Sequence, residues 1–199
     1  MRFASRIAVT STTHVAFLRA LGAEASICGI GDYRSLYEGT LATRFSNRGV
    51  VALGSAYALD VEAVLALSPQ VLLADPISVQ DASALERIRQ AGIPVLPIFE
   101  YLDADPLGRL AWIQVFAALS ARTEPARILL DKEKEAYHKI KAAALVKSCT
   151  PVVLSGFPYR GTWWIPGGKS YLARLIDDAG GRYVFADRGG SGSFSLGAE

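Results

Sequence analysis

The sequence has very few residues of the kinds that bind transition metals or form disulfides. It contains two histidines and two cysteines among 199 residues. Cys28 and Cys149 lie in unrelated contexts without a CxxC spacing, which predicts two buried thiols rather than a zinc half-site or a disulfide framework. His14 and His138 have no Cys, Asp or Glu at metal-ligand spacing, and His138 is expected to face solvent. Because transition-metal sites draw on several His or Cys side chains, we expect no metal site.

The chain also lacks an excess of charge and a long hydrophobic run. Lys and Arg number 21 against 19 Asp and Glu, a formal charge of +2, and the basic residues are scattered, which argues against nucleic acid or an anionic membrane as partner. The longest apolar stretches, such as 71–74 and 93–99, fall far short of the roughly 20 residues that span a bilayer, so no transmembrane segment is expected. Residues 1–6 do not lead into a signal-peptide core, and export cannot be read from them.

Three short motifs resemble catalytic or nucleotide-binding signatures but depart from them. Gly167-Gly168-Lys169-Ser170 ends as a phosphate-binding loop does, but GxxxxGK[ST] would need glycine where Trp163 stands. Gly29-Ile30-Gly31 lacks the third glycine of GxGxxG, since that position is Arg34. Gly189 to Ser193 has serine where the GxSxG nucleophile elbow needs its last glycine. We therefore assign no catalytic residue, and phosphate binding by residues 167–170 stays open as an alternative.

The pattern of apolar residues predicts an α/β fold with a mostly parallel sheet. Strands are expected at 6–10, 26–31, 71–74 and 93–99, helices at 12–21, 60–67 and 83–91, and a polar connection at 32–47. Pro94 and Pro97 predict that the last of these strands lies at a sheet edge, because proline cannot donate to a neighbouring strand.

A helix from Pro106 to about Leu119 is followed by an unusually long one from Glu124 to Val146. A new α/β unit then begins, with a strand at 151–155, a loop rich in Gly and aromatic residues, a helix at 170–179 and a strand at 182–186. Two strands and a helix are too short to bury a core of their own. The sequence therefore predicts an N-terminal lobe at 1–122, a connecting helix at 123–148 and a partial, truncated C-terminal lobe at 149–199.

Polar and aromatic side chains follow the predicted strands, at the sheet edge where parallel α/β folds bind their ligands. Aromatic faces together with Arg and Lys suit a large, flat, anionic molecule better than a sugar phosphate. The candidate ligand-binding residues are Ser11, Thr12, Thr13, Tyr33, Tyr101, Tyr159, Arg160, Trp163, Trp164 and Lys169. Because neighbouring side chains of a strand point in opposite directions, we expect only one of the two tryptophans to be buried.

The order of these segments resembles the cobalamin and ferric-siderophore class of substrate-binding proteins that serve ABC importers. The resemblance covers essentially the whole chain. It is carried by Ser11-Thr12-Thr13-His14, by Cys28 to Gly31, by Asp60 to Leu72 with Gln70 in place of the family's usual Asp, by Gly92 to Val95, by Pro106 to Ile113 and by Trp163 to Tyr171.

The resemblance implies two α/β lobes joined by one long helix, with a ligand in the cleft between them and little hinge motion. In this family one exposed Glu on each lobe docks onto arginines of the permease. Glu62 and Glu199 match these two positions. The resemblance also implies a protein of the periplasm, or a lipoprotein on the outer side of the cytoplasmic membrane, although the family's signal segment and complete second lobe are missing from this sequence.

These inferences together predict a receptor that is not an enzyme. It would capture an iron complex, a ferric siderophore or haem, without a covalently bound cofactor, and deliver it to the permease of an ABC importer. Cobalamin is the nearest alternative ligand. The alternatives from other classes are a cytoplasmic α/β enzyme that uses Gly167 to Ser170 for a phosphate or nucleotide, and a protein-interaction domain whose Trp-rich loop meets a partner.

Overall fold

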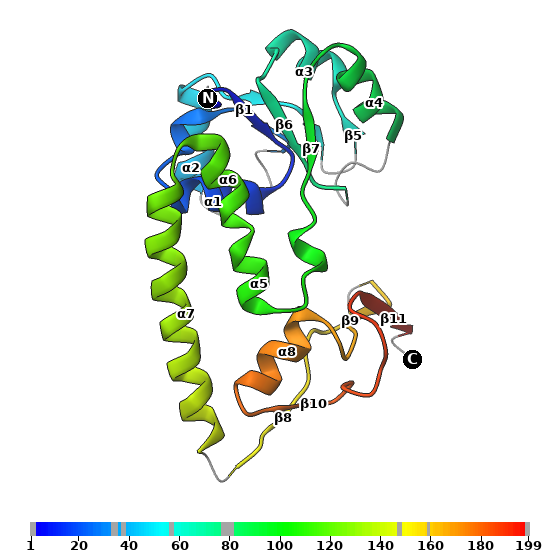
Figure 1. The fold of residues 1–199 in the computed structure, drawn as a ribbon. Helices are drawn as coiled ribbons and strands as arrows, with labels where there is room; N and C mark the ends of the chain where they lie inside the picture. The colour runs from blue at the N-terminus through cyan, green and yellow to red at the C-terminus, as the bar shows by residue number, and fades with distance from the viewer. Residues whose placement is uncertain are drawn as a thin grey trace. The chain divides into compact units, whose positions relative to one another are not determined.

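The computed structural model describes residues 3–32, 36, 39–55, 58–76, 82–146, 149–158 and 160–197 (Figure 1). The chain forms two compact units. Unit 1 consists of Met1–Phe99 and Ile113–Ala126, and unit 2 of Glu100–Trp112 and Arg127–Glu199. The lobe boundaries expected at residues 122 and 148 stay a prediction.

Unit 1 is built on a five-stranded sheet in the order β3-β2-β1-β6-β7, and all four strand pairs are parallel. The strands are β1 (Ile7–Val9), β2 (Ile27–Ile30), β3 (Val51–Ala52), β6 (Val71–Ala74) and β7 (Val95–Pro97). The α/β class with a parallel sheet is thereby confirmed. β7 lies at the sheet edge, as its prolines predict.

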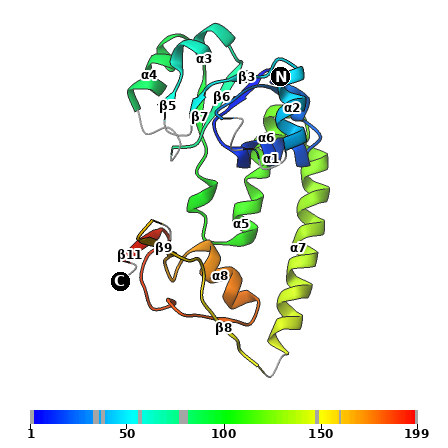
Figure 2. The same cartoon turned by 180° about the vertical axis from the view of Figure 1, so that it is seen from behind.

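Helices cover both faces of this sheet (Figures 1 and 2). They are α1 (Thr12–Ala20), α2 (Gly39–Asn47), α3 (Val61–Leu67), α4 (Ala82–Gln90) and α6 (Ile113–Ser120), with a short η1 (Glu24–Ser26) and a β4 (Gly54–Ser55) to β5 (Ala58–Leu59) hairpin. On one face Val64 of α3 and Ile88 of α4 pack against Leu72. Strand side chains alternate, so the buried Leu73 faces the other side, where α1 contacts β1 and α6.

Helix α2 corrects the polar connection expected at 32–47. It is anchored by only two buried side chains, Leu41 and Phe45, which are four residues apart and so lie on one side of the helix. Two apolar positions in a polar stretch are too few to show a helical period. Burial of Phe45 stabilises this helix by about 2 to 3 kcal/mol. The polar residues around Phe45 give no indication of that burial.

In its described part, unit 2 contains two small two-stranded sheets and four helical segments. They are η3 (Glu100–Leu102), α5 (Pro106–Ala111), most of α7 (Thr123–Leu145), β8 (Val152–Val153), β9 (Thr162–Pro166), α8 (Tyr171–Asp178), β10 (Arg182–Tyr183) and β11 (Ser193–Gly197). β8 and β10 are parallel, whereas β9 and β11 are antiparallel. The single helix expected from Pro106 is in fact two, because α5 ends at Ala111, with Trp112 as its C-cap, and α6 begins at Ile113.

Strand β9 corrects the loop expected before Gly168. Strand β11 lies beyond the last strand that was expected, at 182–186. In β11, Phe194 and Leu196 alternate with Ser and Gly and pair with Ile165 and Trp163. These side chains pack on a core of Ile165, Ala173, Ile176 and Tyr183. The residues after α7 therefore have a small core of their own, because two unforeseen strands contribute to it.

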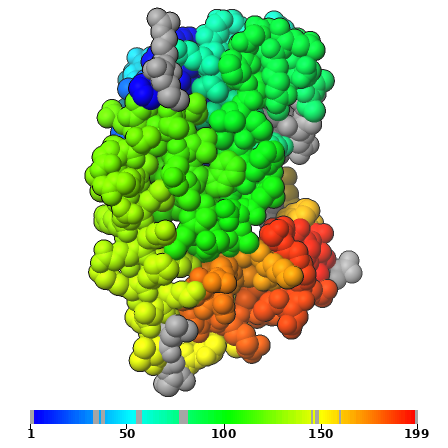
Figure 3. Space-filling model, viewed as in Figure 1, coloured from blue at the N-terminus to red at the C-terminus, as the bar shows by residue number. Residues whose placement is uncertain are grey.

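The long helix α7 has 23 residues, as the sequence predicts, and begins one residue earlier than expected. Glu135 and Lys139 form an i,i+4 ion pair on it, with 2.6 Å between Oε1 and Nζ. Ile140 on this helix is 67% exposed. The parts of α7 and α8 that belong to unit 2 lie against each other (Figure 3). Their side chains meet around Asp178. No helix in the described part of the chain is both long and apolar enough to cross a bilayer.

Candidate functional site

In unit 1 the predicted hydroxyl residues lie at the edge where the parallel strands end. Ser11 caps α1, and its Oγ accepts a hydrogen bond of 3.2 Å from the Thr13 amide. Thr10 Oγ1 accepts one of 2.7 Å from the Asp75 amide, which joins the ends of β1 and β6. Ser11, Thr12 and Thr13 are half-buried. This edge thus presents hydroxyl groups beside a helix N-terminus, which suits a polar or anionic ligand group.

His14, the next residue of α1, is a buried group that the sequence analysis did not place in a site. Its side chain is fully buried, its ring centroid lies 5.6 Å from that of Phe116, and neither ring nitrogen has a hydrogen-bond partner. Burial lowers the pKa of His14 to about 4, although the nearby Asp75 charge acts to raise it. The imidazole is therefore neutral at pH 7. A single histidine at a helix start gives no sequence signal of such burial.

In unit 2 the two adjacent tryptophans of β9 lie on opposite faces, as strand alternation predicts. Trp163 faces the core, with its ring centroid 6.0 Å from that of Phe185 in an edge contact. Trp164 is 65% exposed. Its partner in register on β11 is Ser195, and Thr162 and Gly197 pair beside it. Because these neighbours are small, the indole face of Trp164 is open and offers a flat apolar surface.

Trp163 belongs to the packing of unit 2. Its Nε1 is buried and has no hydrogen-bond partner, and a Cβ on Gly156 would lie 3.0 Å from that nitrogen. Gly156 has φ +78°, a left-handed conformation that glycine adopts without strain. The loop before β9 therefore closes tightly over the indole edge. The ligand-binding role assigned to Trp163 stays a prediction.

The other predicted ligand residues are distributed over several segments. Tyr101 lies in η3 and is half-buried. Arg160 is exposed and has φ 51°, in a turn that it forms with Gly161. Tyr33, Tyr159 and Glu199 lie outside the described residues.

Unit 2 also contains a cavity of about 890 Å³ beside α8. Of the predicted residues only Lys169 lines it, together with Arg174 and Arg182 as further cations and Asp105 and Asp177 as anions. Among the described residues its lining includes one aromatic residue, Tyr183. The mixture of charges, with little aromatic surface, suits a small polar group better than a large flat ligand.

The segment Gly167 to Ser170 does not have the free amides of a phosphate-binding loop. The amides of Gly167, Gly168 and Lys169 donate hydrogen bonds of 2.8, 2.6 and 3.1 Å to the carbonyls of Gly192, Arg188 and Gly190. A phosphate-binding loop needs such amides to point at the ligand. The glycines serve the close approach of two backbone segments, and the geometry gives the phosphate alternative no donor set.

Glu62, the predicted docking residue, lies in the first turn of α3, which Asp60 caps. Its side chain is 78% exposed, and its Oε1 is 2.9 Å from Nη2 of Arg87 on α4. A carboxylate in a first helical turn also interacts favourably with the helix dipole. Glu62 is thus an accessible charge with a local partner.

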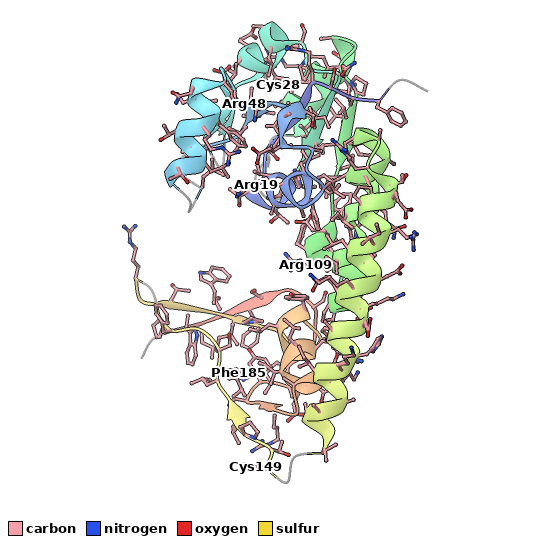
Figure 4. All side chains as sticks on the ribbon, turned by 90° about the vertical axis from the view of Figure 1, so that its left-hand side faces the viewer. Arg19, Cys28, Arg48, Arg109, Cys149 and Phe185 are labelled. Atoms are coloured by element: carbon pink, nitrogen blue, oxygen red, sulfur yellow. The ribbon has the colours of Figure 1, made fainter. Side chains whose placement is uncertain are left out.

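The two cysteines are free, Cys28 half-buried and Cys149 exposed (Figure 4). Two buried thiols had been expected, and Cys149 corrects this because it lies in the connection between α7 and β8. In the described ranges no three His, Cys, Asp or Glu side chains are grouped closely enough to hold a metal ion.

Known proteins resemble this chain along almost its whole length. Three solved structures share its fold. The first is a protein of Staphylococcus epidermidis that is described as a possible iron-binding (periplasmic solute-binding) protein. Its TM-score is 0.76 and its sequence identity 18%, and the match covers 99% of this chain and 72% of that one. A periplasmic haem-binding protein of Vibrio cholerae has TM-score 0.77 and 21% identity, and the match covers 96% of this chain and 69% of that one. A periplasmic vitamin B12-binding protein of Vibrio cholerae has TM-score 0.70 and 14% identity, and the match covers 98% of this chain and 71% of that one.

An uncharacterized lipoprotein of Methanocaldococcus jannaschii is 25% identical over 204 residues, which are 98% of this chain and 48% of the relative. The chain thus spans about half the length of that curated relative. A family model described as periplasmic binding protein matches residues 7–199. Since this match includes both units from β1 to β11, the chain belongs to the periplasmic binding protein family.

Proposed function

We propose that this chain is the substrate-binding protein of an ABC importer that captures an iron complex, either a ferric siderophore or haem, and delivers it to the permease. Membership of the periplasmic binding protein family supports a solute-binding role over almost the whole chain. The observation that carries the choice of ligand is the open face of Trp164 on β9.

An indole exposed to this extent forgoes roughly 2 kcal/mol of the hydrophobic free energy that burial would supply. A flat or conjugated ligand that stacks on Trp164 recovers that free energy and adds the attraction between offset π-systems. Thr162 and Ser195 beside the ring are small enough to let a wide ligand approach. Ferric catecholates and porphyrins have such flat surfaces, whereas a free sugar or amino acid has little.

The metal in this proposal arrives already chelated. The described residues contain no group of His, Cys, Asp or Glu that could hold a bare ion, so binding rests on the organic part of the complex. In unit 2 the charges of Arg160 and Lys169 are suited to its polar periphery. The ligand contacts expected of Ser11, Thr12 and Thr13 in unit 1 stay a prediction. No chemical step is part of this role.

Delivery is proposed to take place at the outer side of the cytoplasmic membrane. A relative described as a lipoprotein supports this location. Glu62 is the proposed contact for permease arginines, since its carboxylate is accessible, and Glu199 is the second proposed contact.

A tryptophan-fluorescence titration tests the proposal. The chain is titrated with haemin, ferric hydroxamate and catecholate siderophores, cyanocobalamin and ATP, in parallel with Trp164→Phe and Trp112→Phe variants. We expect saturable quenching by haemin or one ferric siderophore. Its affinity should fall about threefold in Trp164→Phe, because the smaller phenyl ring keeps only part of the stacking surface. The Trp112→Phe control should bind as the wild type does.

Three results contradict the proposal. Saturable binding of cyanocobalamin alone would replace the iron complex by cobalamin. Binding of ATP alone, lost in Lys169→Ala, would favour a phosphate-binding protein. Silence towards all ligands, in a chain shown to be folded by circular dichroism, would leave a protein-interaction role in place of solute capture.

A further inference from the structure

Arg109 on α5 lies over the aromatic ring of Tyr171, the first residue of α8. The guanidinium carbon is 4.7 Å from the ring centroid, well within the range of a cation–π interaction. Both residues belong to unit 2. Arg109 lies at the end of unit 2 where α8 begins, whereas Cys149 lies at its opposite end (Figure 4). The stacking holds the Arg109 side chain at that end.

Stacking occupies one face of a guanidinium and leaves its N–H donors, which lie in the plane of the group, available. No residue in the described part of unit 2 forms an ion pair or hydrogen bond with the Arg109 guanidinium. Arg174 and Arg127 of this unit differ in this respect. Nε of Arg174 is 3.1 Å from Asp178, and Nη1 of Arg127 is 3.0 Å from Asp131. The Arg109 guanidinium is therefore held in place by the ring of Tyr171, while its N–H groups have no acceptor among the described residues of unit 2.

The carboxylates nearest to Arg109 in the sequence are engaged elsewhere. Asp103 Oδ1 accepts a hydrogen bond of 3.1 Å from the Asp105 amide, and Asp105 Oδ2 accepts one of 3.1 Å from the Gly108 amide. Both therefore serve the start of α5. A planar, half-buried guanidinium that is already fixed loses little conformational entropy when it binds a carboxylate through two parallel hydrogen bonds.

We propose that Arg109 binds a carboxylate of the captured metal complex, so that the ligand is an anionic complex with peripheral carboxylate groups. This inference rests on the proposed function and narrows its ligand class. Lys169, two residues before Tyr171, supplies a second positive charge at the same end of α8. Trp164 would take the flat part of the complex and Arg109 its charged edge. An amide edge such as that of cobalamin offers neutral carbonyl acceptors but no carboxylate for two parallel charge-assisted hydrogen bonds.

Haemin and its dimethyl ester test this assignment, because they share one flat ring and differ only in two carboxylates. Both are titrated into the wild type, Arg109→Gln and Arg188→Gln. Arg188 is the matched control, since its guanidinium also lies over an aromatic ring, 5.7 Å from the centroid of Phe194. Arg109→Lys keeps the charge and removes the planar fork.

The wild type should bind haemin roughly tenfold to a hundredfold more tightly than the ester, as expected for a lost charge-assisted hydrogen bond. Arg109→Gln should lose that preference while its affinity for the ester stays within about twofold of wild type, and Arg109→Lys should keep part of it. Arg188→Gln should keep it fully. An unfolded variant is recognised because it binds neither compound.

The inference is overturned if Arg109→Gln still prefers haemin to the ester as the wild type does, or if the wild type does not bind haemin. The proposed function fails separately, when neither haemin nor any ferric siderophore binds. Haemin binding that is unchanged in Arg109→Gln would leave iron-complex capture standing and remove only the carboxylate assignment.

Discussion

The hydroxyl of Tyr137 on α7 donates a hydrogen bond of 2.6 Å to Oδ2 of Asp178 at the end of α8. Lys141 Nζ and Arg174 Nε lie 2.7 and 3.1 Å from the same carboxylate, which is 6% exposed. Burial acts to raise the pKa of Asp178, but hydrogen bonds from Lys141, Tyr137 and Arg174 outweigh it and lower the pKa to about 2. This cluster joins the long helix to the small core of unit 2.

Replacement of Asp178 by Ala should destabilise unit 2 strongly. It leaves the half-buried Tyr137 hydroxyl without its acceptor and two partly exposed cations without their buried anion, which costs about 2 kcal/mol. Urea unfolding followed by circular dichroism measures the loss. The exposed neighbour Asp177→Ala should change stability by less than about 0.5 kcal/mol. Equal effects at the two positions would contradict the structural role of the cluster.

The same cluster has a defined dependence on pH. The folded pKa of Asp178 lies below its ordinary value of 3.8, so its stabilisation is complete above pH 4 and is lost as the pH falls towards 2. The difference in unfolding free energy between wild type and Asp178→Asn should therefore be constant from pH 5 to 7. It should shrink below pH 4, and a difference that grows on acidification would refute the assignment.

His14 should make unit 1 sensitive to mild acid. Its pKa is lowered from 6.5 to about 4 in the folded chain. As the pH falls, the imidazole is therefore protonated in the unfolded chain before it is protonated in the folded chain. The free energy of unfolding is therefore highest above pH 6.5 and falls between pH 6.5 and 4. At pH 5 it is lower by about 2 kcal/mol. His14→Leu removes two unsatisfied polar atoms and should lose this dependence without loss of stability at pH 7.

Urea unfolding at pH 7 and pH 5 measures this effect, with His138→Gln as the control. His138 is exposed on α7 and should leave the pH dependence unchanged. If His14→Leu and the wild type lose equal stability on acidification, the buried imidazole is not the titrating group.

Gly168 should not tolerate a side chain. A Cβ there would lie 2.0 Å from the Ala186 carbonyl oxygen and 2.7 Å from that of Arg188, and neither backbone segment can move without breaking the turn before α8. Gly168→Ala should cost at least about 2 kcal/mol in thermal or urea unfolding. Gly189→Ala has nothing within 4 Å of the new Cβ and should be nearly neutral. A stable Gly168→Ala variant would show that the contact is not required.

Glu62→Gln should separate ligand capture from delivery. Its exposed carboxylate lies far in the sequence from the residues assigned to the ligand, so the Kd for the metal complex should stay unchanged. Uptake into vesicles that contain the cognate permease should fall about tenfold, the effect of one lost interfacial charge pair. Glu86→Gln, also exposed on unit 1, should transport normally. Normal uptake with Glu62→Gln would remove Glu62 from the docking surface.

The sequence predicted those parts of the fold in which a local pattern repeats. Val71 to Ala74 is a short, wholly buried strand whose apolar run predicts it. Ser11, Thr12 and Thr13 predict the start of α1, because such residues cap helices. α2 was missed because Leu41 and Phe45 are its only buried anchors. β11 was missed because its pairing with β9 is made between residues about 30 positions apart, in a segment that Gly and Ser make similar to a loop.

The candidate site was predictable in residue type but not in placement. Alternation along β9 predicts that one tryptophan is exposed, yet only the fold shows that it is Trp164. Arg109 was not selected, because its position over Tyr171 joins two helices that the sequence separates by 62 positions. No local spacing reveals such a contact, and the resemblance to a family gave no role for that residue.

Equilibrium dialysis tests the central claim most directly, because the absorbance of the metal complex itself reports binding. The chain is dialysed against haemin, a ferric hydroxamate, a ferric catecholate and cyanocobalamin, with Trp164→Ala alongside. We predict that one iron complex is retained at a stoichiometry of about one, with micromolar affinity or tighter, and is retained at least about tenfold more weakly by Trp164→Ala. Retention of no iron complex by the folded wild-type chain, or equal retention by Trp164→Ala, would contradict the account.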